Sequence, residues 1–317
     1  MKSGVDASVV ICTYNRASRI GRVLDDLAAQ AGLGERTWEV LVVDNNSTDD
    51  TRAAVEARRR AGGLPLRYVQ EPARGKSRAL NRGVAESGGA VLAFTDDDVR
   101  IPPTWLAAIL PPFDDPALMG VAGAVLPQWS SPRPGWVSDT EPHRMMAAIV
   151  QYWQGAEAAP ATAPPIGANC AWRRTVFARH GGYRTDLGPG GERAPLGEDT
   201  EFGLRVMSRG ERVWYEPAAL LHHPVAPERL TQDYFTDWYY QSGRVESCRT
   251  DIRPSVRIAG VPRYLFRELA GAATRWFLTP AGSRRFFHKL RTYQTLGRIH
   301  GYRDQHLLAL HVRDDRG

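Results

Sequence analysis

The sequence predicts an α/β fold, with a mostly parallel sheet flanked by helices and a helical C-terminal extension. Three observations predict it. Short apolar runs typical of buried strands alternate with amphipathic helical patterns over residues 7–98. Polar residues directly follow three of these runs, as they do where parallel strands end at a ligand site. Residues 251–317 carry two amphipathic helical patterns and no further strand pattern.

Length and composition set the broad class. At 317 residues, with 43% hydrophobic and 24% charged residues, the chain can bury a large core. Its three cysteines, Cys12, Cys170 and Cys248, are odd in number and widely spaced, which predicts free thiols rather than disulfides or a zinc cluster. No apolar run approaches the roughly 18 residues of a membrane span, and the N-terminus lacks a signal-peptide core. We therefore expect a cytoplasmic protein.

Four apolar runs predict strands in the first part of the chain. The expected strands are Ala7–Cys12, Trp38–Val43, Leu66–Val69 and Ala90–Phe94. Helices are expected between them. Ser18 can cap the first helix, Ser47 or Thr48 can cap the second, and Gly75 opens the third. The apolar face of the first helix is formed by Ile20, Val23, Leu24 and Leu27.

The rest of the chain gives fewer elements. We expect helices over Trp105–Leu110 and from Asp199 to about residue 209, and strands over Gly120–Leu126 and Val213–Tyr215. Two tail helices have apolar faces that consist of Leu265, Leu269, Ala272, Ala273 and Trp276, and of Phe286, Leu290, Tyr293 and Leu296. The aromatic residues Trp129, Trp136, Tyr152 and Trp153 are either sugar platforms or ordinary core.

Three adjacent carboxylates, Asp96–Asp98, follow the fourth expected strand. Because side chains alternate along an extended segment, Asp96 and Asp98 point to one side and Asp97 to the other. Two hard oxygen donors at the carboxyl end of a strand can hold Mg²⁺ or Mn²⁺. A solvated acidic turn is the alternative.

Four segments of the first part occur in a specific order: Val9–Arg16, Val42–Asp49, Gly75–Gly83 and Thr95–Asp98. Together they resemble the ordered signatures of family 2 glycosyltransferases, whose Rossmann-like α/β fold is called GT-A. A single Asp-x-Asp occurs by chance, whereas four signatures in order are specific. We therefore expect a GT-A type sheet.

The resemblance implies a donor site at the strand ends. Asp44 matches the residue that accepts a hydrogen bond from uracil N3–H, with the acid of an Asx turn as the less favoured alternative. Thr13, Tyr14 and Arg16 match the segment that lines the base. Gly75 and Lys76 match a loop near the pyrophosphate, with a plain surface lysine as the alternative. Asp96, which can also contact the ribose, and Asp98 match the metal motif, with Asp97 in a supporting place beside the donor.

Later segments complete the resemblance. Pro165–Arg174 resembles a Gly-x-Asn loop that flanks the donor sugar and contains Asn169. Gly197–Arg205 resembles the Glu-Asp motif of inverting enzymes, in which Asp199 is the catalytic base and Glu198 and Arg205 belong to the donor site. The alternative for Asp199 is a helix cap. The glycine-rich segment 188–197 before it is expected to form a mobile lid. Arg173 and Arg174 either approach phosphate or are exposed helix-start arginines.

Two adjacent histidines, His222 and His223, follow the Pro217–Ala219 run. A histidine in this place faces the metal or the diphosphate in many relatives of the family. The sequence does not choose between the two, and a pair of structural histidines is the alternative.

We expect a GT-A domain over residues 1–230, with a nucleotide-binding half (1–115) and an acceptor half (116–230), and a basic helical extension over 231–317. The implied function is metal-dependent, inverting transfer of a sugar from a nucleotide-sugar, with UDP favoured, to a hydroxyl of a small-molecule, glycan or lipid-linked acceptor. A nucleotidyltransferase acting on a sugar phosphate and a catalytically silent sugar-binding or scaffold protein stay open as alternatives.

The basic charge is concentrated in the tail. Residues 251–317 contain 13 Lys/Arg and 5 Asp/Glu, whereas residues 1–250 contain 28 Lys/Arg and 30 Asp/Glu. We expect tail helices packed on the domain with a solvated basic face; the alternative is peripheral attachment to anionic lipid on the inner membrane face. No nucleic-acid-binding motif accompanies the arginines, so no nucleic-acid partner is expected. A homodimer stays open.

Overall fold

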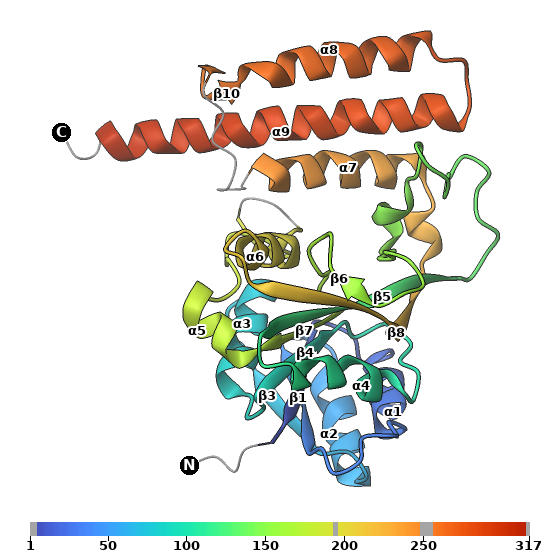
Figure 1. Cartoon of the computed structure of the whole chain (residues 1–317), viewed down its shortest axis with the longest axis vertical. Coiled ribbons are helices and arrows are strands. Elements are labelled where there is room, and N and C mark those ends of the chain that lie inside the picture. Colours follow the sequence, from blue (N-terminus) through green and yellow to red (C-terminus); the bar gives the residue numbers. More distant parts are fainter. Residues whose placement is uncertain (1–4, 193–195, 248–255, 315–317) are drawn as a thin grey trace. The chain divides into compact units, whose positions relative to one another are not determined.

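The computed structural model describes residues 5–192, 196–247 and 256–314, with side chains as far as residue 305 (Figure 1). Residues 193–195 of the predicted lid and Cys248 lie outside the described residues. The chain forms two compact units. Unit 1 comprises Met1–Gln128, Val150–Arg193 and Glu198–Pro224, and unit 2 comprises Trp129–Ile149, Ala194–Gly197 and Val225–Gly317. The residues predicted to bind the donor or the metal or to act as the base belong to unit 1. The domain boundary at residue 230 stays a prediction.

Unit 1 is built around a mixed sheet whose described strands have the order β3-β2-β1-β4-β7-β5-β8-β6. The strands are β1 (Ala7–Thr13), β2 (Trp38–Asp44), β3 (Leu66–Gln70), β4 (Val91–Thr95), β5 (Leu118–Trp129), β6 (Ala159–Pro160), β7 (Asn169–Arg173) and β8 (Arg212–Val225). Strands β3, β2, β1 and β4 are parallel, whereas β7 pairs antiparallel with both β4 and β5. The predicted α/β class is confirmed.

Helices cover both faces of the sheet (Figure 1). One face packs against α1 (Ile20–Ala28), α2 (Thr51–Ala61) and α4 (Trp105–Ile109), followed by the short η1 (Pro111–Asp114). The other packs against α3 (Lys76–Glu86), α5 (Arg174–His180) and α6 (Glu198–Met207). Along β1, Val9 and Ile11 join the first cluster and Val10 the second, so the strand is buried on both sides. That burial explains its continuous apolar sequence.

The predicted side-chain caps of the first two helices are wrong, whereas Gly75 does open α3 (Lys76–Glu86). Helix α1 begins after Arg19 and α2 after Asp50, and neither start has a side-chain cap. Ser18 therefore does not cap α1, and Ser47 and Thr48 form hydrogen bonds to another loop. Ser47 Oγ accepts the Asn15 N–H at 2.9 Å, and the Thr48 N–H donates to Asn15 Oδ1 at 2.8 Å. These bonds join the loops after β1 and β2, so tertiary contact replaces local capping.

Unit 2 is helical. It contains η2 (Met146–Ile149), η3 (Pro227–Arg229), α7 (Gln232–Ser247), the hairpin β9 (Arg257–Ile258) and β10 (Val261–Pro262), α8 (Arg263–Leu278) and α9 (Ser283–Asp314). Figure 1 shows α9 between α7 and α8. Helices α7 and α9 approach closely because Gly243 and Gly297 lack side chains; a Cβ at either would collide with a backbone carbonyl of the other helix. Within the described residues, no helix is long and apolar enough to cross a bilayer.

Candidate active site

The carboxyl ends of β1, β2 and β4 meet at one edge of the sheet. Thr13 of β1 pairs with Asp44 of β2, and Ile11 pairs with Thr95, the last residue of β4. The residues that follow β4 therefore lie beside the loop that follows β1. This is the arrangement that the sequence predicts for a ligand site.

Asp97 turns toward β1 and has a supporting contact there. Thr13 Oγ1 donates to Asp97 Oδ2 at 2.6 Å, and Arg16 Nε lies 3.5 Å from Asp97 Oδ1. Burial raises the pKa of Asp97 to about 6, and the Thr13 hydrogen bond acts in the opposite direction. Thr13 and Arg16 therefore hold the middle of the acidic triplet.

The two outer acids face His223. One ligand atom from each of Asp96, Asp98 and His223 lies within 4.8 Å of the other two. His223 Nδ1 is 3.0 Å from the Pro224 carbonyl, which can only accept, so Nδ1 carries the hydrogen. In the neutral ring the lone pair of Nε2 then faces Asp98 Oδ1 at 3.5 Å. Two acceptors at this separation favour a cation between them. The donor set of two carboxylates and one imidazole fits a divalent ion such as Mn²⁺.

The two histidines lie on opposite faces of β8, because side chains alternate along a strand. The Arg100 N–H donates to the His222 carbonyl at 2.8 Å, and the His222 N–H donates to the Arg100 carbonyl at 3.1 Å, which holds β8 beside the segment that follows the acids. Of the two, it is His223 whose Nε2 lies 3.5 Å from Asp98 Oδ1. His223 is buried, whereas His222 is half-buried. His222, the other candidate ligand, is not part of the cluster.

Lys76, the first residue of α3, lies among carboxylates. Its Nζ is 2.9 Å from Asp96 Oδ1 and 3.5 Å from Glu198 Oε1. Burial opposes its charge, but Asp96, Glu198 and Asp199 raise its pKa well above the usual value. Lys76 is therefore protonated and is not a plain surface lysine. It links the acidic triplet to the Glu-Asp motif of α6.

Glu198 and Asp199 begin α6 and have different surroundings. Glu198 is 3% exposed, and burial raises its pKa to about 7 while Lys76 acts in the opposite direction. Asp199 is half-buried; its Oδ2 accepts the Gly167 N–H at 2.6 Å and its Oδ1 accepts the Thr200 N–H at 2.6 Å. These bonds fix the orientation of the Asp199 carboxylate while solvent still reaches it.

Asp44 is the last residue of β2, and Tyr14 directly follows β1. Asp44 Oδ1 accepts the Ser47 N–H at 2.8 Å, and Asp44 Oδ2 accepts the Tyr68 hydroxyl at 2.7 Å. The turn contact that the sequence left as an alternative is therefore present, and Tyr68 is a partner that the sequence did not reveal. Tyr14 is 37% exposed, and the Arg74 guanidinium lies 3.3 Å from the centre of its ring.

Gly75 has a conformation that favours glycine, with φ of 129°. Its N–H donates to Asn45 Oδ1 at 2.8 Å, which ties this loop to the end of β2. A Cβ on Gly190 would meet Gly75 Cα at 3.1 Å, and the Lys76 N–H donates to the Pro189 carbonyl at 2.9 Å. The described part of the predicted lid therefore packs against the Gly75 loop, while its mobility stays a prediction.

Asn169 and Arg205, which were predicted for the donor site, instead bond to other parts of unit 1. Asn169 is fully buried; its amide nitrogen donates to the Ala124 carbonyl at 2.8 Å and the Ala219 carbonyl at 2.6 Å, and its oxygen accepts Trp105 Nε1–H at 2.8 Å. All its polar atoms are used inside unit 1. We therefore do not assign Asn169 to the donor.

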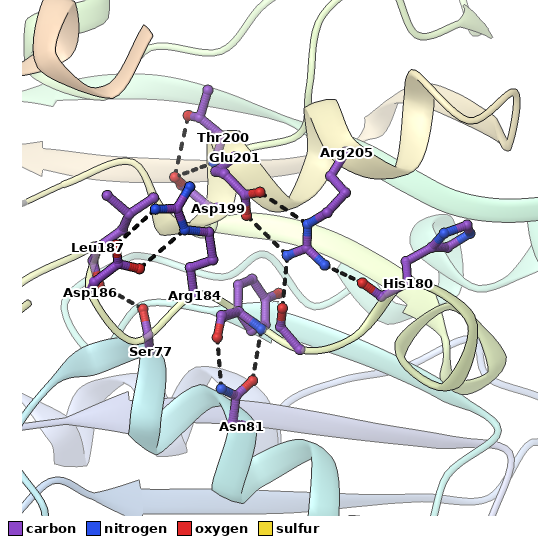
Figure 2. Close-up of polar contacts among 12 residues, drawn as sticks. Ser77, Asn81, His180, Arg184, Asp186, Leu187, Asp199, Thr200, Glu201 and Arg205 are labelled. Carbon is purple, nitrogen blue, oxygen red and sulfur yellow. Dashed lines mark hydrogen bonds and ion pairs between the residues drawn. The ribbon is translucent and has the colours of Figure 1, made fainter. Parts of the chain in front are cut away.

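Arg205 points away from the start of α6, as Figure 2 shows. It pairs with Glu201 through Nε at 3.0 Å and Nη2 at 2.9 Å. It also donates to the carbonyls of His180, the last residue of α5, and of Gly182 in the turn that follows. These contacts hold α6 to that turn, so the predicted donor contact of Arg205 is not supported.

Arg173 and Arg174 lie at the other end of the sheet, because β7 is antiparallel to β4 and Arg173 pairs with Val91. The Arg173 guanidinium donates to the Leu118 carbonyl, and the Arg174 guanidinium donates to the Gly89 carbonyl. Neither approaches the acidic triplet.

Of the four aromatic candidates, only Tyr152 is a core residue, in a hydrophobic cluster of unit 1. Trp129 and Trp136 are partly buried and pack against one hydrophobic cluster of unit 2. Trp153 alone among the four is classed as exposed, at 38%.

Helix α3 has a second role that the sequence reasoning missed. Ser77 Oγ donates to the Leu187 carbonyl at 2.8 Å, and Asn81 bonds both backbone groups of Tyr183, each at 2.8 Å (Figure 2). Ser77 and Asn81 are four residues apart and thus share a helix face. That spacing of two polar residues on one face of the helix was the available signal. They attach the segment before the Glu-Asp motif to the Gly75 loop.

Solved structures share this architecture. A mannosyltransferase from Pyrobaculum calidifontis in complex with GDP-Man and Mn²⁺ matches with a TM-score of 0.55 and 20% identity, over 100% of this chain and 77% of that one. The structure of S. aureus TarS 1-349 matches with a TM-score of 0.54 and 17% identity, over 96% and 92% of the two chains. The fold and the site together define the class: an α/β protein with the GT-A fold.

The family follows from the sequence match. The model of glycosyl transferase family 2 matches residues 8–179, so the chain belongs to that family and is a glycosyltransferase. The succinoglycan biosynthesis protein ExoM of Rhizobium meliloti is 25% identical over 87% of this chain and 81% of its own. The glucosyl-dolichyl phosphate glucuronosyltransferase of Haloferax volcanii is 26% identical over 75% and 76% of the two chains. Because the chain belongs to this family of glycosyltransferases, we no longer retain the two alternatives, a nucleotidyltransferase and a catalytically silent sugar-binding or scaffold protein.

Proposed function

We propose that the protein transfers a sugar from a nucleotide-sugar, for which we favour a UDP-sugar, to an acceptor hydroxyl with inversion at the anomeric carbon and with help from a divalent metal. One observation carries the proposal. Lys76 lies between Asp96 and Glu198, so the candidate metal ligands and the Glu-Asp motif converge from segments about a hundred residues apart. A protonated lysine among these carboxylates suits a site for an anionic diphosphate.

The donor base lies at the ends of β1 and β2 in this proposal. Asp44 accepts the uracil N3–H, while Tyr68 and the Ser47 N–H hold its carboxylate. The exposed ring of Tyr14 stacks on the base. Loop Gly75–Lys76 approaches the diphosphate, since Gly75 has no side chain and Lys76 supplies a positive charge.

Asp96, Asp98 and His223 would hold Mg²⁺ or Mn²⁺. Two observations support this choice of residues. One ligand atom from each lies within 4.8 Å of the other two, and Asp98 Oδ1 faces His223 Nε2. A divalent ion there would offset the negative charge that builds on the diphosphate leaving group. Asp97 keeps the triplet in place through its contacts with Thr13 and Arg16.

Asp199 is the proposed general base. It takes the proton of the acceptor hydroxyl while that oxygen bonds to the anomeric carbon from the face opposite the diphosphate. The bond between the anomeric carbon and the diphosphate oxygen breaks, and the nucleoside diphosphate leaves. The Gly167 and Thr200 N–H groups orient the carboxylate, and its partial exposure admits an acceptor.

The acceptor class is proposed from the relatives. The Haloferax volcanii relative is named for glucosyl-dolichyl phosphate, which is a lipid-linked sugar. We therefore favour a lipid-linked or glycan acceptor over a free small molecule. We also propose a cytoplasmic location, with which the free thiols of Cys12 and Cys170 agree.

A thermal-shift panel tests the donor assignment. Purified protein is heated with UDP-, GDP-, dTDP- and CMP-sugars, each with and without Mn²⁺. A ligand that binds only the folded state raises the unfolding temperature, by a larger amount the tighter it binds. We expect the largest rise with a UDP-sugar and Mn²⁺ together. A larger rise with another nucleotide would reassign the donor, and no effect of Mn²⁺ would contradict the metal.

A further inference from the structure

Helix α8 has two apolar stripes, one buried and one exposed. Leu265 and Ala272 are buried, and Trp276 packs edge to face near Tyr293 of α9 with ring centroids 6.3 Å apart. This stripe joins α8 to α9. An ordinary surface helix needs only this one apolar stripe.

The second stripe faces away from α9. Phe266, Ala270, Ala273 and Phe277 are spaced by four, three and four residues, which places them in one row along the helix. Phe266 is 42% exposed, Phe277 is 69% exposed and the adjoining Leu278 is 78% exposed. Phe277 stacks on Trp276, with ring centroids 5.2 Å apart, and still leaves most of its surface to solvent. Large apolar side chains gathered in this way indicate an interaction surface.

Positive charge surrounds the exposed stripe. Residues 263–291 contain seven Lys/Arg and one acidic residue, Glu268. Glu268 is held by Arg298 at 2.9 Å, so it does not neutralise the exposed face. Arg263 and Arg267 are exposed and lie four residues apart beside the stripe, and Arg284 is exposed just after the turn that follows Leu278.

We propose that this face of α8, made of Phe266, Phe277 and Leu278 with Arg263 and Arg267, docks on an anionic lipid bilayer. The phenyl rings and Leu278 enter the boundary between headgroups and acyl chains, and the arginines contact lipid phosphates. A second copy of the chain fits this face poorly, because an isologous contact would bring the two sets of arginines together. Charge complementarity therefore favours the bilayer. The inference concerns unit 2 alone and does not rest on the proposed donor or metal.

Vesicle flotation of the full-length protein tests the proposal. The vesicles are phosphatidylcholine alone or phosphatidylcholine mixed with phosphatidylglycerol, each at low and high salt. We expect binding to the anionic vesicles only, weakened by salt. F277S/L278S should lower the partition coefficient at least about tenfold. R263Q/R267Q should lower it roughly tenfold to thirtyfold.

The control variant R22Q/R60Q removes the same charge from exposed positions of unit 1 and should bind like the wild type. Circular dichroism verifies that each variant is folded; because the substituted side chains are exposed, we expect no loss of helix. Equal binding to neutral vesicles, or wild-type binding by both α8 variants, would overturn the proposal. So would a dimer in sedimentation analysis that F277S/L278S dissociates while vesicle binding is absent, since α8 would then be a contact between copies.

Discussion

His223 Nε2 lies 3.5 Å from Asp98 Oδ1, with its other ring nitrogen turned to the Pro224 carbonyl. Loss of either side chain should remove a ligand from the proposed metal site. We expect H223A and D98A to lower Mn²⁺ affinity by at least about tenfold, measured by calorimetry in the presence of a nucleoside diphosphate. H222A is the matched control, because His222 is outside the cluster. If H222A and H223A weaken Mn²⁺ equally, the choice of His223 is wrong.

Asp199 should be essential for transfer and dispensable for donor binding. We expect D199N to reduce kcat by about 100-fold to 10,000-fold with the donor Kd unchanged, because the amide keeps the shape but cannot accept the proton. The control E192Q removes one charge from an exposed residue of the preceding segment. Single-turnover transfer and donor titration separate the two effects. Normal transfer by D199N would leave Asp199 as a helix-start acid that anchors Gly167.

Asn169 should matter for stability rather than for the donor. N169A leaves the buried Trp105 indole N–H and the carbonyls of Ala124 and Ala219 without their partner, which should cost about 3 kcal/mol. Calorimetry should show a lower Tm, and the donor Kd of the folded variant should be unchanged. Q128A, which truncates an exposed amide on β5, is the control. An unchanged Tm with weaker donor binding would restore the original prediction.

Glu39 should make stability depend on pH. Its carboxylate accepts Ser8 Oγ at 2.8 Å and Arg67 Nη1 at 2.9 Å, and it also accepts the Gly88 N–H. Burial opposes the charge, but these bonds together lower the pKa of Glu39 below its ordinary value of 4.5. A lowered pKa means that the stabilisation is complete above about pH 4.5 and is lost as pH falls below it.

E39Q should therefore have a lower Tm than the wild type at pH 7, and the difference should shrink as pH falls below 4.5, the ordinary pKa of the group. Thermal unfolding across this range measures it. The exposed Glu35 provides the control E35Q, which should follow the wild type at every pH. A difference that stays constant with pH would mean that the Glu39 charge contributes nothing.

The sequence predicted the features that depend on local pattern. The strand cores and the polar residues at their ends follow from short apolar runs and the polar residues after them. The different contacts of Asp97 and its neighbours do not follow from alternation along a strand, because β4 ends at Thr95 and Asp97 and Asp98 lie in a turn. The choice of His223 depends on contacts of β8 with Arg100 and Asp98 that no local pattern reveals. The scaffold contacts of Asn169 were not predictable for the same reason: its partners come from α4, β5 and β8.

Helix α7 was missed because its apolar side chains do not form a single clear stripe, and its packing depends on Gly243 lying against α9. Ser18, Ser47 and Thr48 were wrong as caps because the loops after β1 and β2 bond to each other. In each case the bonding partner comes from a segment distant in the sequence, so a local sequence pattern does not predict it.

The two bonds between Arg100 and His222 also limit how this protein can change during evolution. The chain between them contains turns and exposed loops in which insertions can be absorbed. An insertion of a single residue between Asp98 and Arg100 would instead move the acid away from the place on β8 where it meets His223. We therefore expect homologues to vary in length elsewhere and to keep this short spacing constant.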